Sequence, residues 1–274
     1  MSRTPRRVLP GFSLSLGYTV FFLSLMVLLP LAACLLKAST LSWSQFVDAV
    51  WTERARAAYA LTLGASLVAA CINVALGGLV AWVLVRYDFP LRRFFDALVD
   101  LPFALPTAVA GLVFASLYAP NGWIGRHLAP LGIDVSYSPA AIVMVLVFTG
   151  FPFVVRTVQP VLQELEPELE EASATLGASR WQTFSRVVLP PLIPAFLTGF
   201  ALALARALGE YGSVIFVAGN RPYHTEIAPV LIVNRLEEYK YAEATALAVV
   251  LLGLSFVLLV AINLLERWSK RHAS

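Results

Sequence analysis

The chain has little charge. Of its 274 residues only 14% are Asp, Glu, Lys or Arg, whereas 59% are hydrophobic, and the mean hydropathy is +0.76. A soluble globular chain carries about 25% charged residues, so this one lacks the polar side chains needed to cover a surface in water. That shortage argues against a soluble enzyme or a disordered scaffold. The net charge of +3 is too small to indicate a nucleic-acid partner. Most of the chain is therefore expected to lie in a lipid bilayer.

Residues that carry catalysis or bind metals are also scarce. The two cysteines, Cys34 and Cys71, lie inside apolar runs, and the three histidines are scattered. Neither a disulfide framework nor a metal site is expected. None of the three lysines follows a glycine, which excludes the Gly-Lys-Ser/Thr motif that binds nucleotide phosphates. The chain is therefore predicted to have no catalytic residues and to bind no cofactor of its own.

Long apolar runs are what the sequence has in abundance. A bilayer core requires about 20 apolar residues per helix, and lipid permits only helices or closed barrels. The prediction is an all-α membrane protein with six transmembrane helices in one domain, residues 1–274. The expected spans are about 17–36, 57–85, 101–119, 140–158, 192–217 and 244–265.

The first run allows two interpretations. Arg3, Arg6 and Arg7 precede an apolar stretch that ends at Cys34, as in a lipoprotein signal that is cleaved before a modified cysteine. A cleavable signal, however, has an apolar core of about 7–15 residues, and this run has about 20, enough to cross a bilayer. A retained first helix is expected, and an intact-mass measurement would test it.

Basic residues predict the orientation. If the amino terminus lies in the cytoplasm, twelve Lys and Arg residues fall on the inside and seven on the outside, with Arg206 left in the membrane. Cytoplasmic loops carry the excess of positive charge. Both termini are therefore predicted to be cytoplasmic.

Small residues recur at helical spacing in two of the spans. A close approach of helix backbones in lipid requires such faces, so we interpret them as packing surfaces rather than as a pore lining. They comprise Ala104, Ala108, Gly111 and Ala115 in the third span, and Ala195, Gly199, Ala203 and Ala207 in the fifth.

The loop between the fourth and fifth spans, residues 159–191, is polar but patterned. Pro167 suits the first turn of a helix, Gly177 its carboxyl cap, and Ser179 the cap of a second short helix that stops before Pro190. Its first half is acidic and would be repelled by anionic lipid. The prediction is a helical elbow that docks into a groove on a soluble partner.

This loop resembles the signature of ABC importer permeases, which is Glu-Ala-Ala, three residues, Gly, nine residues, Ile-x-Leu-Pro. The chain has Glu171-Ala172-Ser173, Gly177 and 187–190 (Val-Val-Leu-Pro) at the same spacing, and departs only at Ser173 and Val187. The resemblance implies the type I importer fold with a cytoplasmic coupling helix. It also implies that the elbow docks into an ATPase subunit through Glu171, Ala172, Gly177, Arg180, Trp181, Leu189 and Pro190.

Further segments are similar to the sulfate/thiosulfate permeases, and the amino-terminal one to their T type rather than their W type. They are 7–12, 100–111, 152–160 and 206–220. The resemblance implies an ATP-driven importer of sulfate or thiosulfate in the inner membrane of a bacterium. The implied partners are a homologous W-type permease, two ATPase subunits that use ATP and Mg²⁺, and a periplasmic binding protein. A molybdate or tungstate permease and a stand-alone secondary anion transporter are the alternatives.

One pair of charges lies inside a predicted span. Arg206 and Glu210 are four residues apart and so share a helix face. They either neutralise each other in the membrane, or Arg206 faces the translocation path and attracts the oxyanion while Glu210 tunes its field. Gly209, Tyr211 and Gly212 complete the candidate gate, with the glycines as a hinge.

Overall fold

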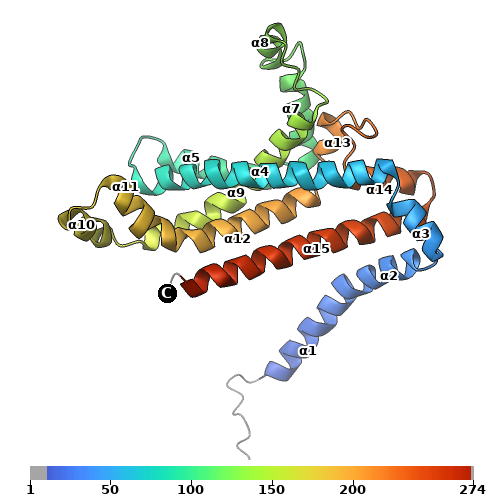
Figure 1. Ribbon diagram of the computed structural model, residues 1–274, viewed down its shortest axis with the longest axis horizontal. Coiled ribbons are helices and arrows are strands. Elements are labelled where there is room, and N and C mark those ends of the chain that lie inside the picture. The colour runs from blue at the N-terminus through green and yellow to red at the C-terminus, as the bar shows by residue number, and fades with distance from the viewer. Residues whose placement is uncertain (1–10, 273–274) are drawn as a thin grey trace, which may run out of the picture.

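The computed structural model describes residues 11–272, which form helices joined by turns and loops and contain no β-strand (Figure 1). Residues 3, 6 and 7 lie outside the described part, as do the side chains of 267–272. The α-helices are α1 (Phe12–Leu23), α2 (Leu29–Ala38), α3 (Trp43–Val50), α4 (Glu53–Arg86), α5 (Arg92–Val99), α6 (Leu101–Ala104), α7 (Thr107–Tyr118), α8 (Gly125–Leu128), α9 (Pro139–Glu164), α10 (Pro167–Thr175), α11 (Arg180–Thr183), α12 (Leu189–Leu208), α13 (Val214–Val217), α14 (Ala228–Glu237) and α15 (Tyr241–His272).

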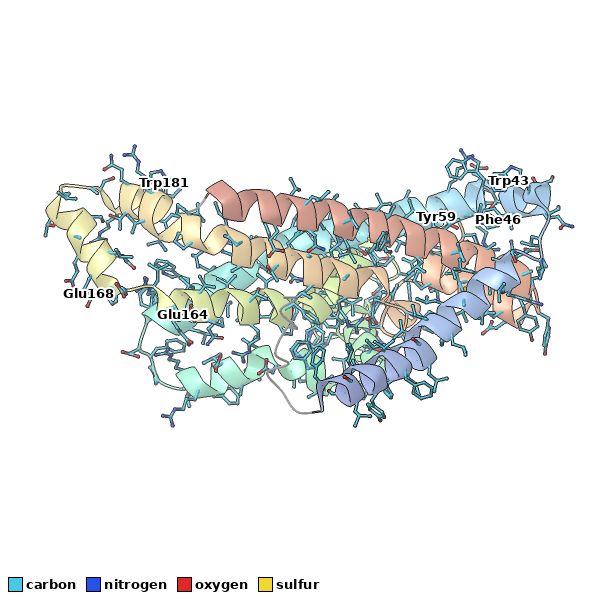
Figure 2. All side chains as sticks on the ribbon, turned by 90° about the horizontal axis from the view of Figure 1, so that it is seen from below. Trp43, Phe46, Tyr59, Glu164, Glu168 and Trp181 are labelled. Carbon is cyan, nitrogen blue, oxygen red and sulfur yellow. The ribbon has the colours of Figure 1, made fainter. Side chains whose placement is uncertain are left out.

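The bundle consists of α4, α9, α12 and α15, which run alongside one another (Figure 1). The elbow of α10 and α11 lies at one end of this bundle, called here the elbow end. The helices α3 and α14 lie at the other, called here the α14 end. Aromatic side chains gather on α3, where Trp43 stacks on Phe46 with ring centroids 5.8 Å apart (Figure 2). Such aromatic groups are typical of a membrane–water boundary.

The first predicted span forms a continuous helix, Phe12–Ala38, with a π-helical turn η1 (Ser24–Leu28) in its middle. Within this helix, α2 packs against α15, whereas α1 points away from the bundle with none of its residues buried (Figure 1). The expectation of a helix there is confirmed. Its retention in the mature protein stays a prediction.

Small residues bring the bundle helices together, as the sequence predicts for the fifth span. Gly199 lies against α9, where an added β-carbon would come within 2.9 Å of Val154 Cα. Gly150 of α9 leaves room for Asn73 of α4, whose amide nitrogen lies 2.5 Å from the position of a Gly150 β-carbon. Packing of this kind replaces the hydrophobic effect as the force that joins helices in lipid.

The third predicted span, 101–119, is not one helix. It breaks at Leu105, which is extended, and resumes as α7 after Pro106. A proline forces the preceding residue out of the helical region and donates no backbone hydrogen bond. The remaining helix, α7, has 12 residues, about 18 Å long, and by itself is too short for a hydrocarbon core of about 30 Å. Because α4 and α9 both end at the elbow, α5, α6 and α7 together return the chain to the other end of the bundle. Ala104 is consequently exposed and does not join the predicted small-residue face.

Five helices in the described range are long and apolar enough to span, and their bounds correct several predicted ones. The fourth span runs on to Glu164, through Pro152 and Pro160. The fifth begins at Arg180 and ends at Leu208, not at residue 217. The second and sixth, Glu53–Arg86 and Tyr241–Glu266, extend beyond their apolar centres because their charged ends remain helical.

The elbow therefore merges into the fifth span, and the prediction of a second helix that stops before Pro190 is wrong. The π-helical turn η3 (Phe184–Val188) connects α11 to α12, and Pro190 lies in the first turn of α12. A proline lacks the backbone N–H that continues an α-helix. Pro190 lies in the first turn of α12, where no such donor is required. The π-helical turn before it is wider than an α-helical one, and the helix continues through this point.

Candidate functional site

The elbow is built by two caps that follow from the sequence. Gly177 follows α10 with φ +82°, and the backbone N–H groups of Gly177 and Ala178 donate to the carbonyls of Ala174 and Ser173, both at 3.0 Å. This is the Schellman arrangement, in which a glycine in the left-handed conformation ends a helix. Ser179 then opens α11, where its hydroxyl accepts from the backbone N–H of Gln182 at 3.3 Å.

The elbow presents an apolar surface to its surroundings. Trp181 is 72% exposed and Leu176 is 88% exposed, and Figure 2 shows Trp181 at the far end of the bundle from Trp43. Glu171, Ala172, Gly177 and Arg180 are exposed on the same elbow. Leu189 and Pro190, predicted to belong with them, lie half-buried in the first turn of α12. Exposed apolar groups beside acidic ones make this a surface that a soluble partner could cover.

The second predicted group lies at the other end of α12. Arg206 and Glu210 form an ion pair, and the Glu210 side chain is only 2% exposed. Its Oε1 atom also accepts hydrogen bonds from the backbone N–H of Ser213 at 2.9 Å and from the Ser213 hydroxyl at 2.7 Å. The carboxylate thus closes the turn that ends α12, and this capping role could not be seen in the i, i+4 spacing alone.

The predicted glycines differ in their surroundings. Gly209 has open space where a β-carbon would be, whereas one on Gly212 would overlap the hydroxyl of Thr107. One on Gly111 would overlap the backbone of Ser213, 2.8 Å from its Cα. The turn after α12 therefore packs directly on α7. Arg206, Glu210 and the two glycines of this turn therefore lie close to the break in the third span. They are separated from the elbow by the length of α12, which is 20 residues or about 30 Å.

This close contact gives a stability prediction. Gly111→Ala should destabilise the protein by about 1–3 kcal/mol, because the neighbouring backbone of Ser213 must move. Gly64→Ala is the matched control, since Gly64 lies in α4 with nothing within 4 Å, and alanine is the better helix former. Thermal unfolding in detergent should show a lower midpoint for Gly111→Ala only. Equal midpoints would contradict the packing.

Two ion-pair networks escaped the sequence analysis. Arg156 of α9 donates to Asp100 at 2.9 and 2.7 Å and to Asp96 at 2.7 Å, which holds α5 and α6 against the bundle. Burial alone would raise the pKa of Asp96, but hydrogen bonds from Arg156 and Gln159 hold it below its ordinary value. The sequence carried one signal, two carboxylates spaced i, i+4, but no indication of their partner.

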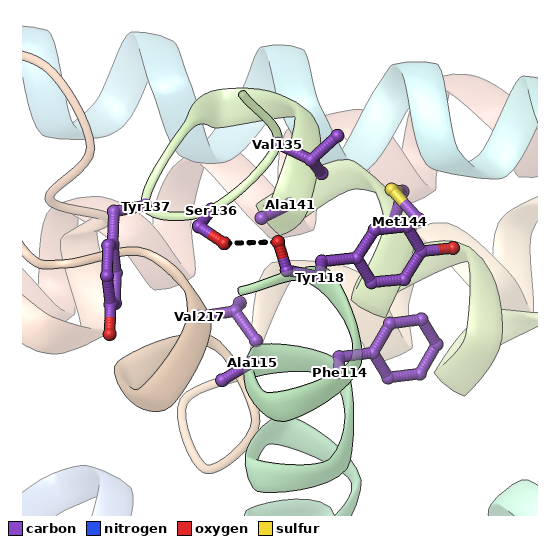
Figure 3. A pocket seen from close by; sticks show the side chains of 9 residues that line it. All are labelled: Phe114, Ala115, Tyr118, Val135, Ser136, Tyr137, Ala141, Met144 and Val217. Carbon is purple, nitrogen blue, oxygen red and sulfur yellow. Dashed lines mark hydrogen bonds between the residues drawn. The ribbon is translucent and has the colours of Figure 1, made fainter. Parts of the chain in front are cut away.

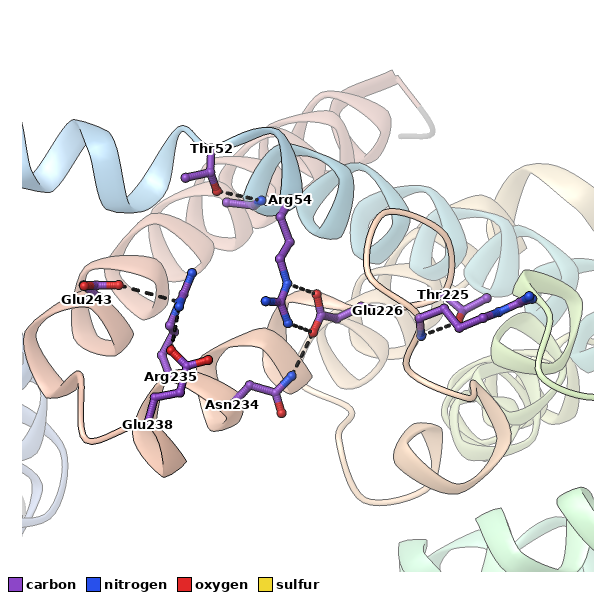
Figure 4. Close-up of polar contacts among 10 residues, drawn as sticks. Thr52, Arg54, Thr225, Glu226, Asn234, Arg235, Glu238 and Glu243 are labelled. Carbon is purple, nitrogen blue, oxygen red and sulfur yellow. Dashed lines mark hydrogen bonds and ion pairs between the residues drawn. The ribbon is translucent and has the colours of Figure 1, made fainter.

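The other network lies at the α14 end (Figure 4). Arg54 binds Glu226 through two hydrogen bonds of 2.7 and 2.6 Å, and Asn234 donates to the same carboxylate at 2.8 Å. Hydrogen bonds from Lys240 and Arg235 lower the pKa of Glu238, the residue that follows α14. The hydrogen bonds of Arg54 to Glu226 fix the segment after α13 to the first turn of α4.

A cavity beside α7 is too small for a substrate. It measures about 10 Å³ and lies between α7, α9 and α13, where the Ser136 hydroxyl donates to the carbonyl of Tyr118 at 2.7 Å (Figure 3). A volume of this size holds at most about one water molecule. Among the described residues no three His, Cys, Asp or Glu side chains gather as a metal site would require.

Five helices within residues 11–272 that are long and apolar enough to span, with an exposed elbow at one end of the bundle, are the features of a multi-pass membrane protein. Comparison with known proteins agrees. The chain is 52% identical over 267 residues to the sulfate transport system permease protein CysT of Salmonella typhimurium, covering 97% of this chain and 96% of that one. It is 51% identical over 256 residues to the protein of the same name from Synechocystis, covering 93% and 90%.

Residues 73–273 match the family described as the binding-protein-dependent transport system inner membrane component. The chain belongs to that family and is a non-catalytic, multi-pass component of the inner membrane. A chain from a bacterial ABC transporter involved in the import of the polysaccharide alginate has the same fold. The TM-score is 0.78 at 18% identity, covering 93% of this chain and 94% of that one. The type I importer fold implied by the resemblance is confirmed.

Proposed function

We propose that this chain is the permease subunit of an ATP-driven importer that passes sulfate and thiosulfate into the cytoplasm. The observation that carries the proposal is its 52% identity, over nearly its whole length, to a protein named as a sulfate transport permease. The exposed elbow supports it, because a chain without a nucleotide-binding motif can be driven by ATP only through another subunit, and the elbow offers a surface on which that subunit can dock.

The physics of the substrate requires a coupled source of energy. Moving one elementary charge against a membrane potential costs about 2.3 kcal/mol per 100 mV. A dianion that enters a negatively charged cytoplasm therefore meets about twice that cost, and a concentration gradient adds to it. In this proposal two ATPase subunits, with ATP and Mg²⁺, supply the energy and dock at Glu171, Ala172, Gly177, Arg180 and Trp181.

The remaining partners follow from the same proposal. A homologous W-type permease forms the second half of the path, and a periplasmic protein delivers sulfate or thiosulfate. The elbow end and both termini face the cytoplasm, as the excess of basic residues predicts. Arg206, one third of whose side chain is exposed beside the turn 209–213, faces the path and attracts the anion, while Gly209, Tyr211 and Gly212 form the gate.

Uptake into proteoliposomes tests this function. The complex of this chain, its partner permease, the ATPase subunits and the binding protein should accumulate radiolabelled sulfate only when ATP is supplied. Unlabelled thiosulfate should compete, whereas molybdate should not. Uptake that needs no ATPase subunit would instead favour a secondary transporter. Stronger competition by molybdate or tungstate would favour a permease for those anions.

A further inference from the structure

The last turn of α4 holds the elbow, although the two are more than 80 residues apart in the chain. Arg86, the final residue of α4, forms an ion pair with Glu170 of α10, and both side chains are partly buried. The Arg86 guanidinium also stacks over the ring of Trp82, 5.5 Å from its centroid. Because Trp82 and Arg86 are four residues apart, they form one continuous face at this end of α4.

The same face of α4 also contacts the second part of the elbow, which consists of α11 and η3. The ring of Trp82 meets that of Phe184 edge-on, with centroids 5.9 Å apart, and Phe184 contacts Trp181 at 5.7 Å. A hydrogen bond of 2.7 Å between the hydroxyls of Ser173 and Thr183 joins the two parts. Both parts of the elbow, α10 and the α11–η3 segment, are therefore attached to the last turn of α4, while the side chains that would meet a soluble partner remain exposed.

The opposite end of α4 is attached to the segment that leads into α14. There Arg54 binds Glu226, and the Thr62 hydroxyl accepts the backbone N–H of Ala228 at 2.8 Å. Between these attachments α4 is one uninterrupted helix of 34 residues, about 50 Å long. A hydrogen-bonded helix of this kind moves as a rigid element, so a displacement of its last turn is transmitted along its length.

We propose that Arg86 and Trp82 form a second joint through which movement of the elbow, which continues directly into α12, also enters α4, with α4 carrying it toward the α14 end. This rests on the proposed function, in which ATPase subunits move the elbow. Arg86 is a positioning residue, because its contacts are Glu170 and Trp82 rather than the anion or the ATPase-facing surface. The joint would therefore set how much sulfate moves for each ATP hydrolysed.

Charge reversal in the reconstituted complex tests the joint. Arg86→Glu should leave the ATPase subunits bound, because it alters no exposed residue of the elbow, and should lower the sulfate moved per ATP by about fivefold or more. Glu170→Arg should do the same. The double variant Arg86→Glu/Glu170→Arg restores opposite charges and should recover most of the ratio.

The matched control is Arg92→Glu, which reverses the charge of an exposed pair, Arg92–Asp88, just beyond α4, and should leave the ratio unchanged. A defect of folding alone lowers uptake and hydrolysis together. An unchanged ratio in Arg86→Glu, or a double variant as impaired as the single ones, would overturn the joint. Absence of ATP-dependent uptake in the unaltered complex would instead overturn the proposed function.

Discussion

Replacing Gly177 by valine is expected to abolish most ATP-driven sulfate uptake. Gly177 has φ +82°, and no atom lies within 4 Å of the position its β-carbon would take, so the effect arises from the backbone alone. An L-residue in the left-handed conformation is destabilised by about 1–2 kcal/mol, and a β-branched one by more. A change of about 1.4 kcal/mol lowers the population of the correctly folded elbow tenfold. If uptake requires the folded elbow, it should fall roughly tenfold or further.

The nature of the side chain should decide the outcome at this position. Gly177→Asn should retain most of the uptake, because asparagine tolerates the left-handed conformation best after glycine. Gly253→Ala is the control for removing a glycine, since Gly253 lies within α15 with open space around it. Co-purification of the ATPase subunits should fall in parallel with uptake. If valine and asparagine behave alike, the elbow does not depend on this cap.

Local rules made the elbow predictable before its structure was known. The glycine at the end of α10 and the serine at the start of α11 act through backbone groups only a few residues away. The pairing of Arg206 with Glu210 was predictable for the same reason, because residues four apart in a helix share a face. Each of these features is determined within about one helical turn.

The prolines show where local rules fail. Pro106 breaks the third span, whereas Pro152 and Pro160 lie inside α9 and leave it helical. A proline always removes one donor, but whether a helix survives depends on how the neighbouring helices pack around the freed backbone. That packing involves residues far away in the chain. The true ends of the fourth and fifth spans therefore could not be obtained from hydropathy.

Contacts between distant segments were the least predictable. Arg156 lies within α9 and binds two carboxylates, those of Asp100 and Asp96, 56 and 60 residues away. Arg86 likewise finds Glu170 across 84 residues. Hydropathy and charge identify such residues as unusual in a membrane protein. Only the arrangement of the helices identifies their partners.

Removing the charge of Glu210 is expected to cause the largest loss of stability. In Glu210→Leu, Arg206 loses its partner and the backbone N–H of Ser213 loses its acceptor. Breaking a fully buried ion pair from one side costs about 3–5 kcal/mol. Because one third of the Arg206 side chain is exposed, the expected cost here is at the lower end, about 3 kcal/mol, still a large share of the total stability of a domain. Thermal unfolding and the yield of assembled complex should both fall sharply. The exposed pair Arg92–Asp88 has the same spacing, and Arg92→Gln should have an effect of less than about 1 kcal/mol.

The double variant Arg206→Met/Glu210→Gln then separates the two interpretations of this pair. Glutamine retains an oxygen that accepts from Ser213, and no unpaired charge remains in the membrane, so stability should return to near that of the unaltered protein. If Arg206 attracts the anion, sulfate uptake should still be lost, because the stable variant has no positive charge beside the turn that follows α12. Uptake equal to that of the unaltered complex would show that the pair only closes this turn. The translocation path would then have to be sought among other residues.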